Sequence, residues 1–409
     1  MESAAASRSS ARADRPGAGR AGAIAMNPRS LLLELYDAAL REVDGNTGAA
    51  EVLANLGAGP VALFAIGKAA STMTRGAYAA IGADIRQALL ITKDGHTDPE
   101  VARLPNLHVI ESAHPVPDAR SLAAGAELER RIGGLSADEY PVFLISGGSS
   151  SLVELLKPGI TLDDLRALNE RGLAQGWDIA TLNAARAELS RLKRGGVARM
   201  LAGRPAHALF ISDVPDDDPG VIGSGLLGPA AGVDDQVLRI VFANIDDATH
   251  CAAMRGAMHG LAFDLRKDRF SGDAAAVARQ FVDALRETRA DGLVWGGEST
   301  VVLPEKSGRG GRNQHLALVA AGAMRAGDDF TILAAGTDGT DGNTDDAGAV
   351  VDAGTLSRAE LAGVDVERAL REFDSALALE AAEDLVHTGP TGTNVGDILI
   401  GIKQRRRVL

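Results

Sequence analysis

Aromatic side chains, cysteine and positive charge are all scarce in this sequence of 409 residues. Aromatic residues make up 3% of the chain and hydrophobic residues 45%, so alanine, valine, leucine and isoleucine must build the interior. That mixture suits helices packed on parallel strands. The single cysteine, Cys251, excludes an internal disulfide bond and a thiolate zinc cluster. The net charge of −13 argues against a nucleic-acid partner, which needs a basic face.

The sequence also lacks a long hydrophobic run. No stretch approaches the ~20 apolar residues that a membrane-spanning helix needs, so we expect a cytoplasmic protein without a membrane partner. Residues 1–25 contain four arginines and no apolar segment of the ~7–15 residues found in a secretory signal. We expect this segment to be a disordered tail, or to precede the true start at Met26.

From about residue 26 onward, short apolar runs alternate with amphipathic helical patterns. The apolar runs predict buried strands at 61–66, 88–92, 107–110, 141–145 and 208–211. Because these runs are apolar throughout and do not alternate with polar residues, they are typical of parallel strands covered by helices on both faces. Ligands of such sheets bind at the carboxyl ends of the strands.

A glycine- and proline-rich passage at 225–232 interrupts this rhythm and indicates a domain junction. A second series of predicted strands follows, at 238–242, 293–295, 300–303, 330–334 and 398–400. A chain of this length exceeds what one hydrophobic core usually organises. We therefore predict an α/β fold with two Rossmann-like domains, residues 26–233 and 234–403, built on parallel or mixed sheets.

Lys68 opens a predicted helix directly after the strand at 61–66. A lysine there can meet an anion with its own charge and with the helix N-terminus. The loop is not a Walker A motif, because Ala62 replaces the first glycine and Ala69 replaces the magnesium-binding hydroxyl residue. Taken alone, a lysine in this position is more often a surface cation than a ligand of an anion.

The loop Ser146–Ser151, Ser-Gly-Gly-Ser-Ser-Ser, follows the strand at 141–145. Its glycines allow consecutive backbone N–H groups to converge, and its hydroxyls add donors, which predicts a nest for a carboxylate or phosphate. The alternative is a plain turn with Ser149 as the helix N-cap. A serine-hydrolase elbow is excluded because the fifth position of Gly-x-Ser-x-Gly is Ser151.

Carboxylates follow two other strands: Asp213 begins an acidic loop after 208–211, and Asp338 lies in a polar loop after 330–334. Massed negative charge is costly unless solvent or a cation screens it, so these loops are either fully hydrated or face a divalent ion. The chain from Gly308 to Gln314 places Arg309 and Arg312 on flexible glycines at a helix start, where arginine can clamp an anion.

Lysine, arginine, a Gly/Ser nest and carboxylates at strand ends are together the parts of a phosphoryl-transfer site. The sequence resembles the class II glycerate kinases, the family with the "multi-organism fragment with rich leucine" (MOFRL) domain, which older naming often calls hydroxypyruvate reductases. The matching motifs run from roughly Leu31 to Lys403 and include Gly67–Ala70, Thr92–His96, His114–Asp118, Ser146–Ser151, Leu182–Asn183, Ser212–Val214, Gly296–Val301, Gly308–Asn313, Thr337–Gly348 and Thr388–Asp397.

The resemblance implies ATP-dependent phosphorylation of D-glycerate at its 2-hydroxyl with Mg²⁺, giving 2-phosphoglycerate and ADP. It also implies two α/β domains with the active site in the cleft between them, and a MOFRL region over about 290–402. Lys68 and Arg312 match the family's key cations. We keep a homodimer as a candidate assembly and expect no nucleic-acid partner.

Within this resemblance, we expect Lys68 to stabilise the transferring phosphoryl group or hold the glycerate carboxylate, and Arg312 to clamp phosphate. Asp213 and Asp338 are expected to contact the metal, or to accept the proton of the glycerate hydroxyl. Lys193 receives no role, because Arg194 interrupts the family's Leu-Ser-x-x-Lys-Gly-Gly pattern. The predicted contacts to substrate or phosphate are Ser146, Gly147, Gly148, Ser149, Ser150, Asn183, Asn313, Thr337 and Asn394.

Two other functions are weighed against the kinase. A nicotinamide-dependent hydroxypyruvate reductase needs a Gly-x-Gly-x-x-Gly loop directly after a strand, with an acidic residue ~20 positions on. The match at Gly223–Gly228 lies about ten residues beyond its strand, so this placement is wrong. A binding protein without activity would not explain why cations and carboxylates gather at strand ends in both halves.

Overall fold

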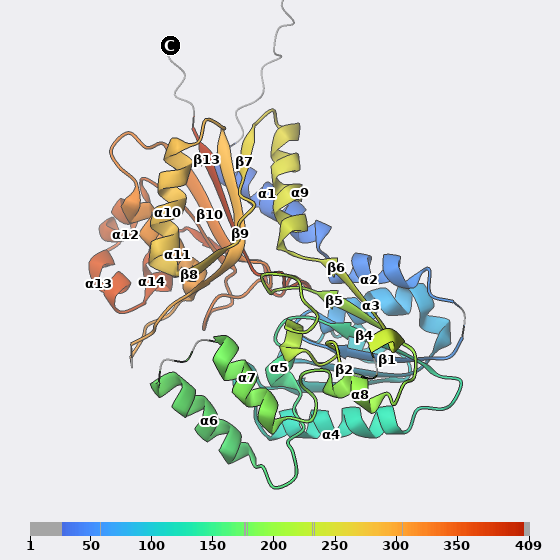
Figure 1. Cartoon of the computed structure of the whole chain (residues 1–409). Coiled ribbons are helices and arrows are strands. Elements are labelled where there is room, and N and C mark those ends of the chain that lie inside the picture. The colour runs from blue at the N-terminus through green and yellow to red at the C-terminus, as the bar shows by residue number, and fades with distance from the viewer. Residues whose placement is uncertain are drawn as a thin grey trace, which may run out of the picture.

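The computed structural model describes residues 27–404, except 58, 176, 178, 231, 233 and 305. Two β-sheets form the molecule, each covered by helices, one at the upper left and one at the lower right of Figure 1. This arrangement confirms the predicted α/β class. The expectations for residues 1–25 and for the basic segment 405–407 lie outside the described residues.

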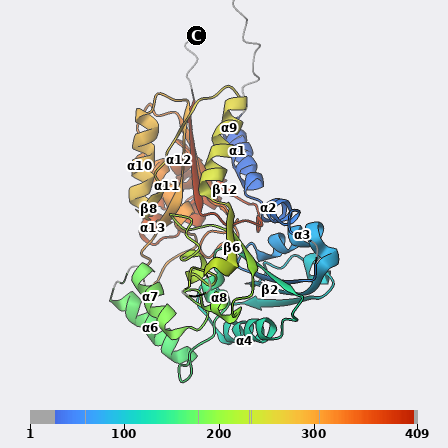
Figure 2. The same ribbon diagram turned by 45° about the vertical axis from the view of Figure 1, so that its right-hand side comes forward.

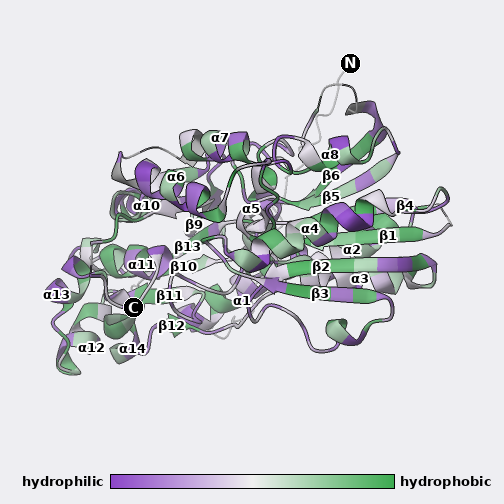
Figure 3. Ribbon diagram, turned by 90° about the horizontal axis from the view of Figure 1, so that it is seen from below, coloured by the Kyte–Doolittle hydropathy of each residue, from purple (hydrophilic) through white to green (hydrophobic). Residues whose placement is uncertain are grey.

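The first sheet has six parallel strands in the order β3-β2-β1-β4-β5-β6. Every residue of β1 is buried, as expected for a strand that is covered on both faces, and Figure 3 shows long green stretches in β1 and in its neighbour β2. The strands are β1 (Val61–Ile66), β2 (Ile85–Lys93), β3 (Leu107–Ser112), β4 (Tyr140–Ile145), β5 (Ala206–Ile211) and β6 (Val237–Ala243).

Successive side chains of β1 enter two different cores. Leu63 and Ala65 pack with Met73 of α3, while Phe64 and Ile66 belong to the core on the opposite face. The first face carries α2 (Gly45–Leu53) and α3 (Ala70–Ile81), and the second carries α4 (Ala119–Gly133), α5 (Ser149–Leu152) and α8 (Gly196–Met200). A pair of helices, α6 (Leu162–Ala174) and α7 (Ile179–Leu189), projects from this unit (Figure 1).

The strand order of the first sheet reverses between β1 and β4. In open α/β sheets, such a switch point opens a crevice at the carboxyl ends of the two strands. Lys68 follows β1 and the loop Ser146–Ser151 follows β4, so both predicted anion-binding segments lie at this point.

The second sheet is mixed, in the order β12-β11-β10-β13-β9-β7, with β8 paired to β9. β7 and β8 run parallel to β9, and the other pairs are antiparallel. The strands are β7 (Phe263–Leu265), β8 (Phe270–Asp273), β9 (Gly292–Thr300), β10 (Phe330–Gly336), β11 (Gly348–Asp352), β12 (Leu385–Val386) and β13 (Asp397–Lys403).

Helices cover this sheet on both sides, as Figure 2 shows. In β10, Leu333 faces α1 and α9, whereas Ile332 and Ala334 face the other helices. On the first side lie α1 (Pro28–Glu42) and α9 (Ile245–Met258). On the second lie α10 (Ala274–Glu287), α11 (Arg312–Ala323), α12 (Thr355–Leu361), α13 (Val366–Arg371) and α14 (Ser375–Ala381).

The two sheets do not divide the chain where the sequence indicated. β6 was assigned to the second domain but pairs with β5 in the first sheet, and α1 was assigned to the first domain but packs on α9, β10 and β13. Residues 225–228 form a turn, and Leu226 and Leu227 within it are buried in the core of the first sheet. This part of the passage therefore belongs to the first sheet and is not a junction between the two. A boundary at residues 233/234 therefore does not follow the sheets.

Other elements also differ from the prediction. Residues 301–303 form no strand of their own, because β9 already ends at Thr300. The antiparallel strands β11 and β12 were not predicted. The two units share one hydrophobic cluster, which includes Leu63 of the first sheet and Leu333 and Ile400 of the second. None of the described helices is long and apolar enough to span a lipid bilayer.

Candidate active site

Two polar contacts join the loops of the first sheet to those of the second. The Nζ of Lys68, after β1, lies 2.7 Å from the Oδ2 of Asp338, after β10. The Nδ2 of Asn394, before β13, donates to the Oδ2 of Asp213, after β5, at 3.0 Å. Four of the predicted residues, from four different strand ends, thus meet between the two sheets.

Lys68 is held at the start of α3 by backbone contacts from the β4 loop. Its N–H donates to the carbonyl of Gly147 at 2.9 Å, and the N–H of Ala69 donates to the Oγ of Ser146 at 3.1 Å. Ser146 is fully buried, so its hydroxyl anchors the α3 loop. The predicted contact between this hydroxyl and an anion stays a prediction.

The charge of Lys68 depends on its neighbours. Burial alone would lower the pKa of this amine, but Asp338 and Asp213 raise it above its ordinary value. For Asp338 the two effects have the opposite signs. Burial would raise the pKa of this carboxyl, but the contact with Lys68 lowers it below its ordinary value. Both groups are charged at neutral pH, and Lys68 keeps 18% of its side chain exposed.

The β4 loop turns at Gly148, whose φ of 85° is a left-handed conformation that favours glycine. No hydrogen bond to another loop of the described chain is found for the backbone N–H groups of Gly147, Gly148, Ser149 and Ser150. Consecutive free N–H groups at a turn form an anion-binding nest. We call these four residues the β4 nest.

The hydroxyls of this loop point elsewhere. Gly148, not Ser149, is the N-cap of α5, and the buried Oγ of Ser149 lies against Gly223 with no partner among the described residues. The Oγ of Ser150 hydrogen-bonds the Oγ of Ser224 at 2.7 Å. The alternative interpretation, with Ser149 as the N-cap, is therefore wrong. The anion contacts of Ser149 and Ser150 stay predictions, and the backbone N–H groups are the other donors of this loop.

Asp213 lies directly beside the β4 nest. A Cβ on Gly147 would come within 1.9 Å of both the Oδ2 of Asp213 and the Nδ2 of Asn394, so only glycine fits there. Burial raises the pKa of Asp213, although Lys68 opposes the shift. A carboxylate with a raised pKa and an uncharged hydrogen-bond partner is suited to accept a proton.

Arg312 is the first residue of α11 and faces two carboxylates. Its Nε and Nη2 contact the Oδ2 and Oδ1 of Asp397 at 2.7 and 3.0 Å, and its Nη1 lies 2.7 Å from the Oε1 of Glu298. Although burial opposes the charge, these carboxylates raise the pKa of Arg312. Arg312 also opposes the charge of Lys68, which places the two predicted cations in one electrostatic site.

The N-terminus of α11 is not free to bind phosphate. The carboxylate of Asp341 accepts the N–H of Asn313 at 3.1 Å and that of Gln314 at 2.7 Å. Burial raises the pKa of Asp341 to about 7, although the two hydrogen bonds from the backbone favour the charged form and lower it. Asn313 also donates from its Nδ2 to the Oδ1 of Asp397 at 3.0 Å. Its side chain therefore helps to position Asp397, the carboxylate that contacts Arg312.

Two of the predicted substrate contacts, Thr337 and Asn183, lie outside the cluster around Lys68. The Oγ1 of Thr337 donates to the carbonyl of Gly396 at 2.7 Å and accepts the N–H of Val395 at 2.9 Å, so it fixes the loop that carries Asn394. Asn183 lies on α7, where its Oδ1 accepts a bond from Arg186 at 3.3 Å. The structure shows no contact between Asn183 and the Lys68 site among the described residues.

Sequence reasoning assigned no role to Glu298, Asp397 and His114. Each lies in a motif that carried the family resemblance, but no periodic pattern marks it. The imidazole of His114 lies against Gly148 and close to Lys68. Burial, together with Lys68 and Lys93, lowers the pKa of His114 to about 3, so the ring is neutral.

Of the two predicted metal ligands, Asp213 is better placed than Asp338 to hold an ion. Within the described part of the chain, no group of three or more His, Cys, Asp or Glu residues is arranged to hold an ion. Asp338 is committed to Lys68 and to the N–H of Thr340, whereas Asp213 has one oxygen bonded to an amide only. Mg²⁺ usually binds through one or two carboxylates together with substrate phosphates, and Asp213 fits that requirement better.

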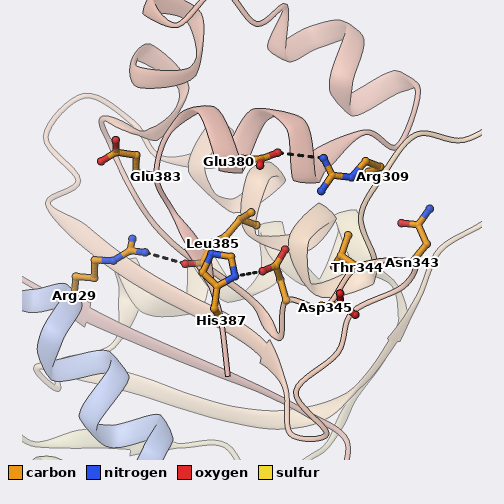
Figure 4. Close-up of a pocket in the computed structure, with 10 residues that line it drawn as sticks. Arg29, Arg309, Asn343, Thr344, Asp345, Glu380, Glu383, Leu385 and His387 are labelled. Carbon is orange, nitrogen blue, oxygen red and sulfur yellow. Dashed lines mark hydrogen bonds and ion pairs between the residues drawn. The ribbon is translucent and has the colours of Figure 1, made fainter. Parts of the chain in front are cut away.

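A separate cavity of about 670 Å³ lies at the outer edge of the second sheet (Figure 4). Arg309 contacts Glu380 across it at 3.1 Å, and His387 pairs with Asp346. Lys68, Asp213 and Arg312 do not line this cavity, so it is not part of the site described above.

Two family models match the chain. The model described as "Domain of unknown function (DUF4147)" matches residues 24–251, more than half of the chain. The model of the MOFRL family matches residues 292–397, close to the expected span.

Several characterised or named proteins are similar over nearly the whole length. The D-glycerate 2-kinase of Thermotoga maritima is 30% identical over 412 residues, covering 91% of this chain and 98% of its own. The glycerate 2-kinase of Pyrococcus horikoshii is 31% identical and covers 85% and 88%. A protein of Agrobacterium vitis, provisionally named hydroxypyruvate reductase, is 32% identical and covers 91% and 94%.

The fold is similar to that of a solved structure. The crystal structure of the Thermotoga maritima glycerate kinase superposes with a TM-score of 0.81 at 30% sequence identity, covering 92% of this chain and 99% of the other. The arrangement of two helix-covered sheets is therefore shared with that protein.

Proposed function

Because the chain belongs to the class II glycerate kinase family, with a DUF4147 region followed by a MOFRL region, we propose that it phosphorylates D-glycerate. The γ-phosphoryl group of ATP is transferred to the 2-hydroxyl, giving 2-phosphoglycerate and ADP. The observation that carries the proposal is the meeting of Lys68, Asp213, Asp338 and Arg312 between the two sheets.

The free N–H groups of the β4 nest and the Lys68 amine make one end of the site positive. Donors that are already aligned stabilise the charge on a transferring phosphoryl group without reorganising during the reaction. At the other end, Arg312 is held by Asp397 and Glu298. We place the substrate anions between these groups, in the predicted cleft between the sheets.

Transfer requires the glycerate hydroxyl to lose its proton as its oxygen forms the new P–O bond and the bond to ADP breaks. Asp213 is our candidate for the proton acceptor, because burial raises its pKa and its side-chain partner, Asn394, is uncharged. Asp338 suits this role less, since Lys68 lowers its pKa. We therefore give Asp338 the role of holding Lys68 in place.

Four carboxylates surround the two cations, namely Asp213, Asp338, Asp397 and Glu298. This excess of negative charge would repel a triphosphate unless a divalent ion accompanies it. We therefore propose that ATP binds with Mg²⁺ beside Glu298, and that Asp213, the other candidate ligand, is left to accept the proton. The ion would neutralise phosphate charge when bound.

The reductase alternative has little support in the geometry. The loop after β1 reads Gly67-Lys68-Ala69 and lacks the glycine fingerprint. The segment Gly223–Gly228 includes a short turn of helix and packs against the β4 loop, without following a strand. A strand order shared with nucleotide-binding folds does not by itself specify a nicotinamide enzyme.

A coupled assay tests the proposal directly. Purified protein is incubated with ATP, Mg²⁺ and D-glycerate, ADP formation is followed, and the product is identified by ³¹P NMR as 2- or 3-phosphoglycerate. We expect 2-phosphoglycerate. Oxidation of NADH or NADPH with hydroxypyruvate, without ADP formation from glycerate, would overturn the kinase assignment and support the reductase.

A further inference from the structure

Two motifs of the first sheet contribute to the family resemblance but have no role in the reaction described above. Thr92–His96 lies at the end of β2, and His114–Asp118 follows β3. β1, β2 and β3 are parallel neighbours, so both motifs lie at the same edge of the sheet as Lys68. They bring three more basic side chains to this edge, those of Lys93, His96 and His114.

These side chains gather around Lys68. A Cβ on Gly148 would come within 3.2 Å of the Cδ2 and Nε2 of His114 and also of the Cγ of Lys68, so the imidazole lies beside the lysine stem. His96 interacts with the backbone of Lys68. The charges of Lys68 and Lys93 act on both imidazoles. We call Lys93, His96 and His114 the basic cluster.

The chain supplies no carboxylate to balance this cluster. Asp94, which follows Lys93 in the sequence, pairs with Arg120 instead. Across the part of the chain that the structure describes, Lys93 forms no ion pair and the His114 ring forms no hydrogen bond. All three side chains of the cluster are half-buried, so a ligand can still reach them. In a chain with a net charge of −13, such a group indicates a place for an anion.

The chemistry of the basic cluster suits a carboxylate. Lysine supplies a positive charge, and a neutral imidazole keeps one N–H group that can donate to an anionic oxygen. Burial and the nearby lysines lower the pKa of both rings. The rings therefore donate without adding charges that the lysines would repel.

The β4 loop relates the basic cluster to the proton acceptor. His114 lies against Gly148, and Asp213 lies against Gly147, the preceding residue. Adjacent α-carbons are about 3.8 Å apart, and Lys68 acts electrostatically on both side chains. In a 2-hydroxy acid the hydroxyl and the carboxylate are likewise on adjacent carbons. A molecule of this class can therefore present its hydroxyl to Asp213 and its carboxylate to the cluster.

We propose that Lys93, His96 and His114 bind the carboxylate of the hydroxy-acid substrate and select an acid over an uncharged analogue. The inference rests on the proposed function and deepens it, because it names the residues that recognise glycerate and not ATP. Lys68 is then left to stabilise the transferring phosphoryl group.

The test compares D-glycerate with D-glyceramide, in which an uncharged amide replaces the carboxylate. Lys93→Met removes a charge, His114→Leu removes a donor, and His114→Gln keeps an N–H donor on a side chain of similar reach. The matched controls are His108→Leu, at the opposite end of β3, and Lys157→Met, at an exposed lysine. For each protein, kcat and KM are measured for both acceptors and for MgATP, with calorimetric dissociation constants and melting temperatures.

We expect the wild type to prefer D-glycerate, as judged by the ratio of the two kcat/KM values. Lys93→Met and His114→Leu should reduce this preference at least about ten-fold by raising KM for D-glycerate, because each removes one charge-assisted contact. KM for MgATP should not change. His114→Gln should regain much of the preference, and the controls should keep it within about three-fold. Since the preference is a ratio within one protein, loss of folded enzyme cancels from it.

An unchanged preference in Lys93→Met and His114→Leu would refute the inference. So would a rise in KM for MgATP alone, because it would assign the cluster to phosphate. If His114→Leu does not fold, Lys93→Met decides the question by itself. If the wild type forms no ADP with D-glycerate, the proposed function fails, and the dissociation constants decide the inference: equal values for D-glycerate in the wild type and in Lys93→Met would refute it.

Discussion

At the scale of single residues, function depends on where each charge finds its partner. Lys68 was identified from the sequence as a cation at a strand end, but that description fits many surface lysines. The contact with Asp338, which is 270 residues away, distinguishes it. No local pattern contains that information, because the two strands belong to different sheets.

Lys68→Ala should lower turnover at least about 100-fold, because it removes a charge that stabilises the transferring phosphoryl group. The ADP-release assay measures the loss, and circular dichroism checks the fold. Lys157→Ala, at an exposed lysine, serves as the control and should leave turnover unchanged. Wild-type kinetics in folded Lys68→Ala would rule out the catalytic role.

The pH dependence of turnover tests Asp213. Burial raises the pKa of this carboxyl, and a base acts only when deprotonated. Activity should therefore fall as the pH drops through the raised pKa, and Asp213→Asn should lower kcat about 100-fold or more and abolish this acidic limb.

Glu298→Gln is the informative comparison, because the pKa of Glu298 is also raised by burial. If the acidic limb persists in Asp213→Asn and vanishes in Glu298→Gln, the proton acceptor is Glu298 and our assignment is wrong.

At the scale of elements, apolar runs were sufficient to predict the parallel strands. The predicted strand at 61–66 coincides with β1, and 141–145 differs from β4 by one residue. β7 and β12 are only three and two residues long, too short for a detectable pattern. The loops were harder still: Ser146 and Ser149 looked like anion donors, but burial directs their hydroxyls into the protein.

Gly147→Ala tests the close approach of the β4 loop to the second sheet. The added methyl group would overlap Asp213 and Asn394, so the loop or these partners must move, and activity should fall at least about ten-fold. Gly133→Ala provides the control, because nothing lies near its Cβ position on α4. Steady-state kinetics and melting temperatures of both variants are compared. Full activity of Gly147→Ala would show that the contact is dispensable.

At the scale of the whole molecule, the chain crosses between the two sheets more than once. α1 begins the described chain but packs on the second sheet, and the Tyr36 hydroxyl donates to the carbonyl of Gly336 at 2.6 Å. That carbonyl immediately precedes Thr337 and Asp338. A single hydrophobic cluster then continues from Leu35 through both sheets, so the two units depend on each other.

Leu35→Ala should destabilise both units together. Truncating a fully buried leucine costs about 2–5 kcal/mol, and we expect calorimetry to show one transition that moves to lower temperature. Leu361→Ala, at a side chain that is 90% exposed, should leave the transition in place. Two separate transitions, with only one of them shifted, would contradict a shared core.

The sequence by itself determined the α/β class, the parallel first sheet, the segments that carry the site and, through its motifs, the family. These follow from local pattern, because a buried strand and a glycine turn are each specified by neighbouring residues. Only the tertiary structure decided that β6 belongs to the first sheet and that α1 packs on the second. It also decided that Asp341 occupies the N-terminus of α11 and that Lys193 is buried next to the β4 loop. The reason is that burial and charge pairing act between segments far apart in the chain, where sequence separation carries no information about distance.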